Sequence, residues 1–273
     1  MRRALFEELQ GSPLTDELRA ESLWYTIPNL KVRRPVIKNK EATLLEIIHS
    51  NKSIARYGDG EIMVMAGLGI AFQEYDAVLA RRLQEIVHNH DENLMVGIPH
   101  IFYYPYLYPD MVVNNHLSVS KQFNIEGVAL WRNRLNKWID IETVYYSTDI
   151  SGLTSEQFVV FRDFLRDKHV VLTLCKEAFD AYQHNLFDTA KKIDYVFIPN
   201  KHAFRQYDAV LQKLSSFPKK ALHILMAGPA ADLWAVDLCA QGFRALDLGH
   251  IAKTYDYAMR GKKADAKFWE PDE

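Results

Sequence analysis

The sequence predicts an α/β protein with a Rossmann-like, mostly parallel sheet and helices on both of its faces. In the second half of the chain, short apolar runs alternate with helical stretches. Continuous apolar runs of about five residues are typical of parallel strands that are buried on both faces. Glycines follow several of these runs, where the chain must turn from a strand into a helix. Right-handed crossovers between such strands give a doubly wound sheet.

The composition is that of a soluble globular protein. The 273 residues allow one large domain or two closely joined ones, and 48% are apolar while 25% are charged. The net charge of −2 gives no electrostatic footprint for nucleic acid, so no nucleic-acid partner is expected. Cys175 and Cys239 lie in apolar runs and are expected to be buried free thiols. No apolar segment reaches the roughly 20 residues that span a bilayer, and the N-terminus lacks a signal core. We therefore expect a cytoplasmic protein, and leave open contact with the inner face of the membrane and homo-oligomerisation.

The first half of the chain is expected to contribute an arm and the first strands. Residues 1–40 are polar, basic and proline-containing, and are interpreted as an arm over a single catalytic domain at 41–260. A tail is expected at 261–273. Helices are predicted at 41–51, 76–89 and 117–138, with strands from Ser53 and at Leu94–Ile98.

The second half carries the clearest alternation. Strands are predicted at Val170–Leu174, Tyr195–Ile198, Leu222–Met226 and Ala245–Leu248, and helices at 178–191, 204–214 and 231–241. Gly242 stands where a helix-ending glycine is expected.

The segment Ser53–Ile62 suggests a metal–diphosphate site at the end of a strand. Arg56 offers a fork of donors suited to phosphate oxygens. Gly58 and Gly60 free the backbone, so that Asp59 and Glu61 can turn towards one point. Two carboxylates suit a divalent cation whose other ligands are phosphates and water. The same residues also form a common solvent-facing turn, and both interpretations stay open.

Two further strand ends are expected to meet this segment, because ligands bind beyond the carboxyl ends of parallel strands. Gly228 and Pro229 lead into a helix N-terminus that can receive an anion. Asp247 and His250 follow the last predicted strand, and with Asp256 they are the candidates for a general base. Asp247 and His250 could equally be a structural pair.

Aromatic residues crowd the stretch 100–110, among prolines that exclude a regular element. Rings at Tyr103–Tyr108 and Trp131 could stack acceptor sugars, but a packed loop or an oligomer contact is the favoured interpretation. The absence of G-x-G-x-x-G and of a P-loop lysine argues against a standard NAD site and against an NTPase.

These segments together resemble the bacterial glycosyltransferases of the GT-D fold type, which carry a D-x-E motif. The R-[FY]-G-D-G-E signature of that family is matched at Arg56–Glu61. The likeness continues, in order, through Ile70–Gln73, Asn93–Pro99, Asn185–Asp188, Ala203–Phe204, Gly228–Ala230 and Asp247–His250.

The resemblance implies that a hexose is moved from a UDP-sugar, often UDP-glucose, to a glycan or glycoprotein acceptor. It implies Mn²⁺ or Mg²⁺ at Asp59 and Glu61, with Arg56 and Gly58 beside the diphosphate. Family members often carry a glycine-rich stretch at 176–184, which has no glycine here, and Asp256 stands near the place of a further Glu. The alternatives are a catalytically silent relative that binds a glycan or a partner enzyme, and another Rossmann-type enzyme such as a methyltransferase.

Overall fold

The computed structural model describes residues 34–88, 91–104, 107 and 131–262. Within these residues the chain forms one sheet of eight strands, in the order β1-β4-β3-β2-β8-β7-β5-β6, and every neighbouring pair is parallel. The strands are β1 (Val36–Lys38), β2 (Ser53–Arg56), β3 (Leu94–Ile98), β4 (Val144–Ser147), β5 (His169–Cys175), β6 (Lys192–Ile198), β7 (Leu222–Leu225) and β8 (Arg244–Asp247). The predicted α/β class and parallel sheet are confirmed.

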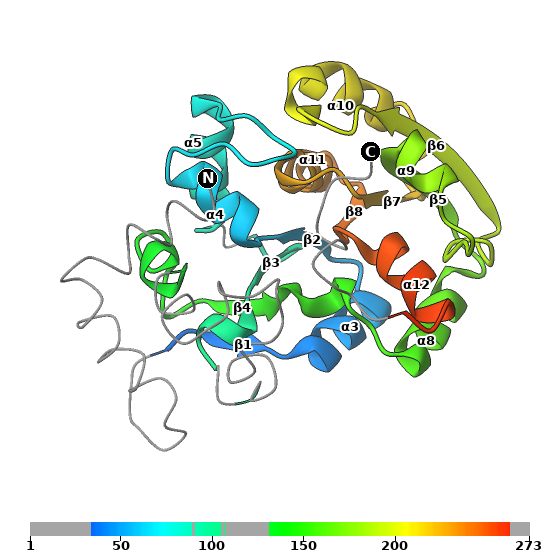
Figure 1. Cartoon of the computed structure of the whole chain (residues 1–273), viewed down its shortest axis with the longest axis horizontal. Helices are drawn as coiled ribbons and strands as arrows, with labels where there is room; N and C mark the ends of the chain where they lie inside the picture. The colour runs from blue at the N-terminus through cyan, green and yellow to red at the C-terminus, as the bar shows by residue number, and fades with distance from the viewer. Residues whose placement is uncertain (1–33, 89–90, 105–106, 108–130, 263–273) are drawn as a thin grey trace.

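Helices cover both faces of the sheet (Figure 1). One layer holds α4 (Asp59–Met65), α5 (Ala77–Ile86), α10 (Tyr207–Ser215) and α11 (Pro229–Ala240). The opposite layer holds α3 (Lys40–His49), α8 (Ser155–Leu165) and α12 (Ile251–Met259). A short helix, α9 (Lys176–Asp180), follows β5 directly.

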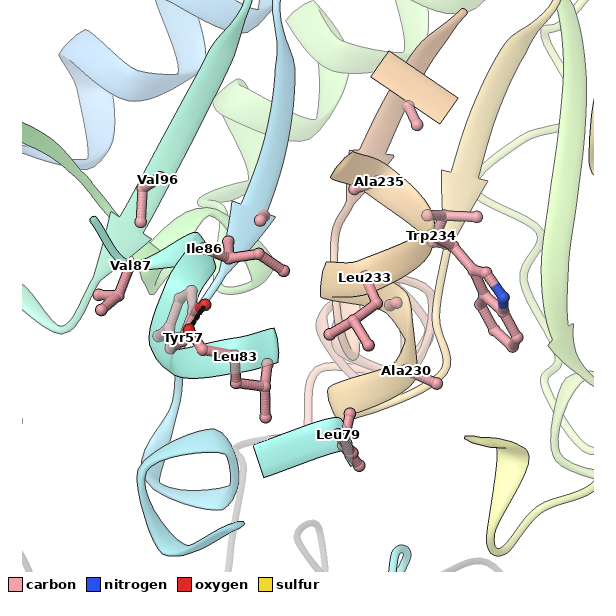
Figure 2. Close-up of a cluster of buried hydrophobic side chains, with 14 of the residues drawn as sticks. Tyr57, Leu79, Leu83, Ile86, Val87, Val96, Ala230, Leu233, Trp234 and Ala235 are labelled. Atoms are coloured by element: carbon pink, nitrogen blue, oxygen red, sulfur yellow. Dashed lines mark hydrogen bonds between the residues drawn. The ribbon is translucent and has the colours of Figure 1, made fainter. Parts of the chain in front are cut away.

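The core of the first layer lies between β2, α5 and α11 (Figure 2). Tyr57 is fully buried there, and its hydroxyl donates to the Leu83 carbonyl at 2.5 Å. Trp234 on α11 is also fully buried, and its indole N–H donates to the Tyr207 carbonyl at 3.1 Å. Burying large aromatic side chains while satisfying their polar atoms fixes α11 and α5 against the sheet.

Local signals in the sequence set the helix ends. The Asp76 carboxylate accepts from the backbone N–H groups of Val78 and Leu79 and so begins α5. Gly242, at φ +79°, follows the C-cap residue Gln241 of α11, the position expected for a helix-ending glycine. Its N–H donates to the Cys239 carbonyl, and the Phe243 N–H donates to the Leu238 carbonyl. This pair of bonds is the Schellman arrangement, which satisfies the last carbonyls of the helix.

Several elements differ from the prediction. Strands β1 and β4 and helices α8 and α12 were not predicted, and β1 places the last residues of the expected arm in the sheet. The predicted helix at 178–191 is wrong beyond α9. In this segment the backbone N–H groups of residues 183 and 184 donate to the Asp256 carboxylate of α12, and the N–H of residue 187 donates to the Asn185 side chain. Side chains thus replace the helical bonds of this segment.

Several expectations fall partly outside the described residues. The predicted helix at 117–138 is described only from residue 131, and residues 105–106 and 108–130 of the aromatic stretch lie outside the description. Where the stretch is described, Phe102 and Tyr103 are buried, and the Tyr103 hydroxyl donates to Asn136. These two rings are therefore packed core. Both cysteines are free thiols, but only Cys175 is buried as expected, whereas Cys239 is half-buried; burial raises the pKa of each. In the described part of the chain, no helix combines the length and apolar character needed to cross a bilayer.

Candidate active site

The site lies where the two helical layers separate at the carboxyl edge of the sheet. Strands β2 and β8 are neighbours. After β2 the chain enters α4, in the layer of α11, whereas after β8 it enters α12, in the layer of α8. The chain leaves these two adjacent strands towards opposite faces, which makes their carboxyl ends the position where α/β sheets bind ligands.

The acidic pair belongs to a helix rather than to the flexible turn that was expected. Gly58 is the N-cap of α4, so Asp59 is its first residue and Glu61 its third. The Glu61 carboxylate turns back and accepts from the Gly58 N–H at 2.6 Å, in a capping-box arrangement. A side chain at position 58 would come within 3.1 Å of that carboxylate. The two acids thus lie at the positive end of the α4 dipole.

Gly60 has a role that the sequence analysis did not foresee. It lies within α4 rather than in a turn, and a Cβ atom there would come within 3.0 Å of the Ile70 Cδ1 atom. The glycine therefore lets the segment after α4 pack directly against the helix, between the two acidic residues.

The N-terminus of α11 faces the same edge. Gly228 has φ +57° and ψ −149°, a region that is almost exclusive to glycine, and Pro229 is the first residue of the helix. No atom lies within 4 Å of the place where a Gly228 Cβ would stand. There is therefore open space beside Gly228, and the dipole of a 12-residue helix favours an anion there.

The end of β8 holds the Arg56 side chain. Gly249 has φ +52°, and a Cβ atom at this position would stand 1.8 Å from an Arg56 guanidinium nitrogen. The end of the guanidinium therefore occupies the place where any other residue at position 249 would carry its Cβ atom. Asp247 is 2% exposed, and its carboxylate accepts from the Gly249 N–H at 3.0 Å, which fixes this turn.

Asp232 is a site residue that the sequence analysis missed. It lies in the first turns of α11, is fully buried, and accepts from the Arg56 backbone N–H at 2.7 Å. Its other carboxylate oxygen is buried without a hydrogen-bond partner. The signal was an acidic residue inside the apolar run Pro-Ala-Ala-Asp-Leu-Trp-Ala. Such a residue is seldom fully buried unless it is paired.

Burial controls the protonation of these acids. It raises the pKa of Glu61 to about 7, against the opposing charge of Arg56. It raises the pKa of Asp247 to about 6, again against Arg56. Burial, followed by the charges of Asp247 and Glu61, raises the pKa of Asp232 well above its ordinary value. Three buried carboxyl groups around one guanidinium leave surplus negative charge when ionised, so the cluster favours a cation.

Comparison with known proteins agrees with this geometry. A family model described as Glycosyltransferase GT-D fold matches residues 54–269. The chain belongs to the GT-D family of glycosyltransferases. It is 25% identical over 248 residues to glycosyltransferase GlyD of Streptococcus pneumoniae serotype 4, covering 85% of this chain but 29% of that protein. It is also similar to the solved structure of domain of unknown function 1792, described as having a distinct glycosyltransferase fold. The TM-score is 0.78 and the identity 26%, over 93% of this chain and 94% of the other.

The family assignment confirms the expected glycosyltransferase and sets the methyltransferase alternative aside. The chain spans less than a third of the length of GlyD.

The residues of this GT-D domain suit a cation that phosphates help to hold. Among the described residues, no three His, Cys, Asp or Glu side chains gather as a metal-binding group. A cation bound mainly by phosphate and water needs only one or two protein carboxylates. Asp59 and Glu61 in the first turn of α4 supply two, and the buried charge surplus around Glu61 gives a reason for a cation to bind.

The candidate bases are placed differently from one another. His250 is exposed at the N-cap of α12, three residues after the end of β8. Asp247 is buried beneath the turn. Asp256 is 1% exposed, and its oxygens accept from the backbone at residues 183 and 184 and from Arg260. Burial acts to raise the pKa of Asp256, but the hydrogen bonds from Arg260 and His184 outweigh it and leave the pKa below its ordinary value. These contacts make Asp256 an anchor for the 183–184 segment.

Proposed function

We propose that this domain transfers a hexose from a UDP-sugar, with UDP-glucose as the first donor to test, to a glycan or glycoprotein acceptor, and that it requires Mn²⁺ or Mg²⁺. One observation supports this most directly. The Arg56 guanidinium, the first turn of α4 and the open N-terminus of α11 converge at the carboxyl edge of β2, β7 and β8. All three suit a charged diphosphate.

Each group has a role in that proposal. The dipole of α11 would favour one phosphate beside Gly228. Arg56, pressed against Gly249, would donate to the leaving diphosphate as its negative charge develops. Asp59 and Glu61 would hold a divalent cation, which stabilises the same charge when bound. His250 is the exposed candidate and would take the proton from the acceptor hydroxyl.

The direct test is UDP release from a panel of UDP-sugars, with and without Mn²⁺, in the presence of candidate acceptor glycans. Asp59→Ala is expected to lower turnover by about 10²-fold or more, the scale at which lost charge stabilisation acts. Arg81→Ala is a matched surface control, because the Arg81–Glu85 pair is exposed on α5. Wild-type turnover in Asp59→Ala, or full turnover in the presence of a chelator, would contradict the metal role.

UDP binding without transfer from any donor would instead favour the alternative, a silent relative that binds a glycan or a partner enzyme. The segment at 176–184 is the place to look in that case, because here it forms α9 and an irregular stretch rather than a glycine loop.

A further inference from the structure

The segment 69–76, which joins α4 to α5, forms a compact strap across the carboxyl edge of the sheet. Its first half is a tight turn: the Ile70 N–H donates to the Gln73 carbonyl at 2.7 Å, and the Gln73 N–H donates back to the Ile70 carbonyl at 3.3 Å. Ile70 packs on Gly60 between the two acids of α4. The first residues of the strap therefore pack against α4 between Asp59 and Glu61, the candidate cation ligands.

His202, in the loop after β6, fastens the far end. Its backbone N–H donates to the Phe72 carbonyl at 2.7 Å, and its ring Nδ1 accepts from the Glu74 N–H at 3.0 Å. An accepting Nδ1 requires the neutral ring with the proton on Nε2. His202 has φ +58°, and it is the one non-glycine residue in the described part of the chain with a positive φ. A residue held in this region indicates that the surrounding contacts outweigh the strain.

Two further contacts join the same loops. The Gln73 side chain, 2% exposed, accepts from the Phe204 N–H at 3.3 Å. Arg205 and Glu74 form a two-pronged ion pair at 2.5 and 2.6 Å, but both side chains are exposed. Exposed ion pairs contribute little to stability. The contacts of His202 and Gln73 therefore hold the strap to the loop after β6.

The topology decides what the strap covers. One end follows β2 and α4, the other is tied to the loop after β6, and strands β8, β7 and β5 lie between β2 and β6. Four strand spacings of about 4.8 Å separate β2 from β6 by roughly 19 Å. Helix α11 packs between α5 and α10, the helices that follow the two joined loops. The strap therefore crosses the end of the sheet at which α11 begins.

The strap brings Phe72 to His250. The two ring centroids are 6.2 Å apart, with the ring planes tilted by 52°. This separation is within the range of aromatic pairs that attract one another. Phe72 is half-buried, whereas His250 is exposed. The phenyl ring is thus a fixed partner for a side chain that faces solvent.

We propose that Phe72 is a positioning residue for His250, and that His202 holds Phe72 in place through the strap. The proposal rests on the assignment of His250 as the base. Proton transfer needs the base within hydrogen-bond distance of the acceptor hydroxyl, and small displacements of a reacting group are costly. The Phe72 ring, 6.2 Å from the imidazole between centroids, limits the orientations that this imidazole can take.

The first experiment is a double-mutant cycle of Phe72→Ala and His250→Ala, measured as transfer rate and donor KM. Phe72→Ala alone is expected to lower kcat by about tenfold with donor KM nearly unchanged. In the His250→Ala background it should have almost no further effect, because its partner is gone. Additive losses would overturn the proposal. Wild-type turnover of His250→Ala would refute both the base assignment and the positioning role.

A second readout does not depend on turnover. The His250 ring signal, assigned in NMR spectra by comparison with His250→Gln, should shift and broaden in Phe72→Ala. If no donor supports transfer by the wild type, the proposed function fails, yet this signal still reports on the contact. An unchanged His250 signal would overturn the positioning role whatever the activity shows.

Substitutions at His202 test the attachment of the strap. His202→Gly keeps the positive φ without strain but removes the Nδ1 acceptor, so it should reproduce both the kcat loss and the NMR change of Phe72→Ala. His202→Asn keeps an acceptor and tolerates positive φ, so it should restore much of both. Equal behaviour of the glycine and asparagine variants would overturn the role of His202.

Discussion

The raised pKa of Glu61 leads to a pH dependence of cation–nucleotide binding that can be measured directly. Burial raises this pKa to about 7, and only the carboxylate form can bind a cation. Below pH 7 the carboxyl group keeps its proton, and binding must displace it. For a pKa of about 7, roughly a tenth of the sites are ionised at pH 6 and roughly nine tenths at pH 8. The affinity for Mn²⁺–UDP should therefore rise about tenfold, or ~1.4 kcal/mol, between these pH values.

Isothermal titration calorimetry at pH 6, 7 and 8 measures this rise, and buffers with different ionisation heats count the proton released. Glu61→Gln is the matched control, because it keeps the size of the side chain and the carbonyl oxygen that can cap Gly58, but cannot titrate. The nucleotide's own titration appears in both proteins, so the difference between them isolates Glu61. A wild-type affinity that follows the same pH curve as Glu61→Gln would refute the reasoning.

The remaining predictions concern glycine, aspartate and histidine positions. Gly249→Ala should abolish most activity, because its Cβ would stand 1.8 Å from the Arg56 guanidinium, whereas Gly242→Ala at φ +79° meets no atom within 4 Å and should cost only stability, about 1 kcal/mol. Equal activity of these two variants in the transfer assay would contradict the role of Gly249. Asp232→Asn should keep the acceptor for the Arg56 N–H and retain far more activity than Asp232→Ala; equal activities would refute this. His223 is fully buried, and burial lowers its pKa from 6.5 to about 4. The unfolded chain therefore binds a proton first as the pH falls, and the stability of the wild type relative to His223→Leu should drop by about 2 kcal/mol between pH 7.5 and pH 5. Urea unfolding at both pH values checks this, and a pH-independent difference would contradict it.

The sequence alone was sufficient for the fold class because parallel strands buried on both faces carry a simple signal. Runs such as Val170–Leu174 and Leu222–Met226 are continuous and apolar, and they became β5 and β7 with nearly the predicted bounds. The edge strand β1 has only three residues, and β4 has four. Short strands of this kind produce little periodicity, so tertiary pairing rather than local pattern defines them.

The site was predictable where glycine and charge coincide at strand ends. The convergence of the Arg56–Glu61 and Gly228–Pro229 segments followed from parallel topology alone. The detailed geometry of the site could not be predicted from the topology. Asp59 and Glu61 proved to be helical, because the capping bond from Gly58 to Glu61 requires the folded turn. Asp232 was missed because its reason for being buried, the Arg56 N–H, lies 176 residues away in the sequence.

Gly60, the middle residue of the Asp-Gly-Glu triplet, has no functional group, yet its size limits which residue can stand at position 70. A methyl group at residue 60 would come within 3.0 Å of the Ile70 Cδ1 atom, so the tip of the Ile70 side chain would have to shift by a few tenths of an ångström. Any larger residue there would need a smaller partner at position 70, so we expect these two positions to vary together among relatives of this chain. The glycine between the two acids therefore also sets how closely the 69–76 strap can pack against α4.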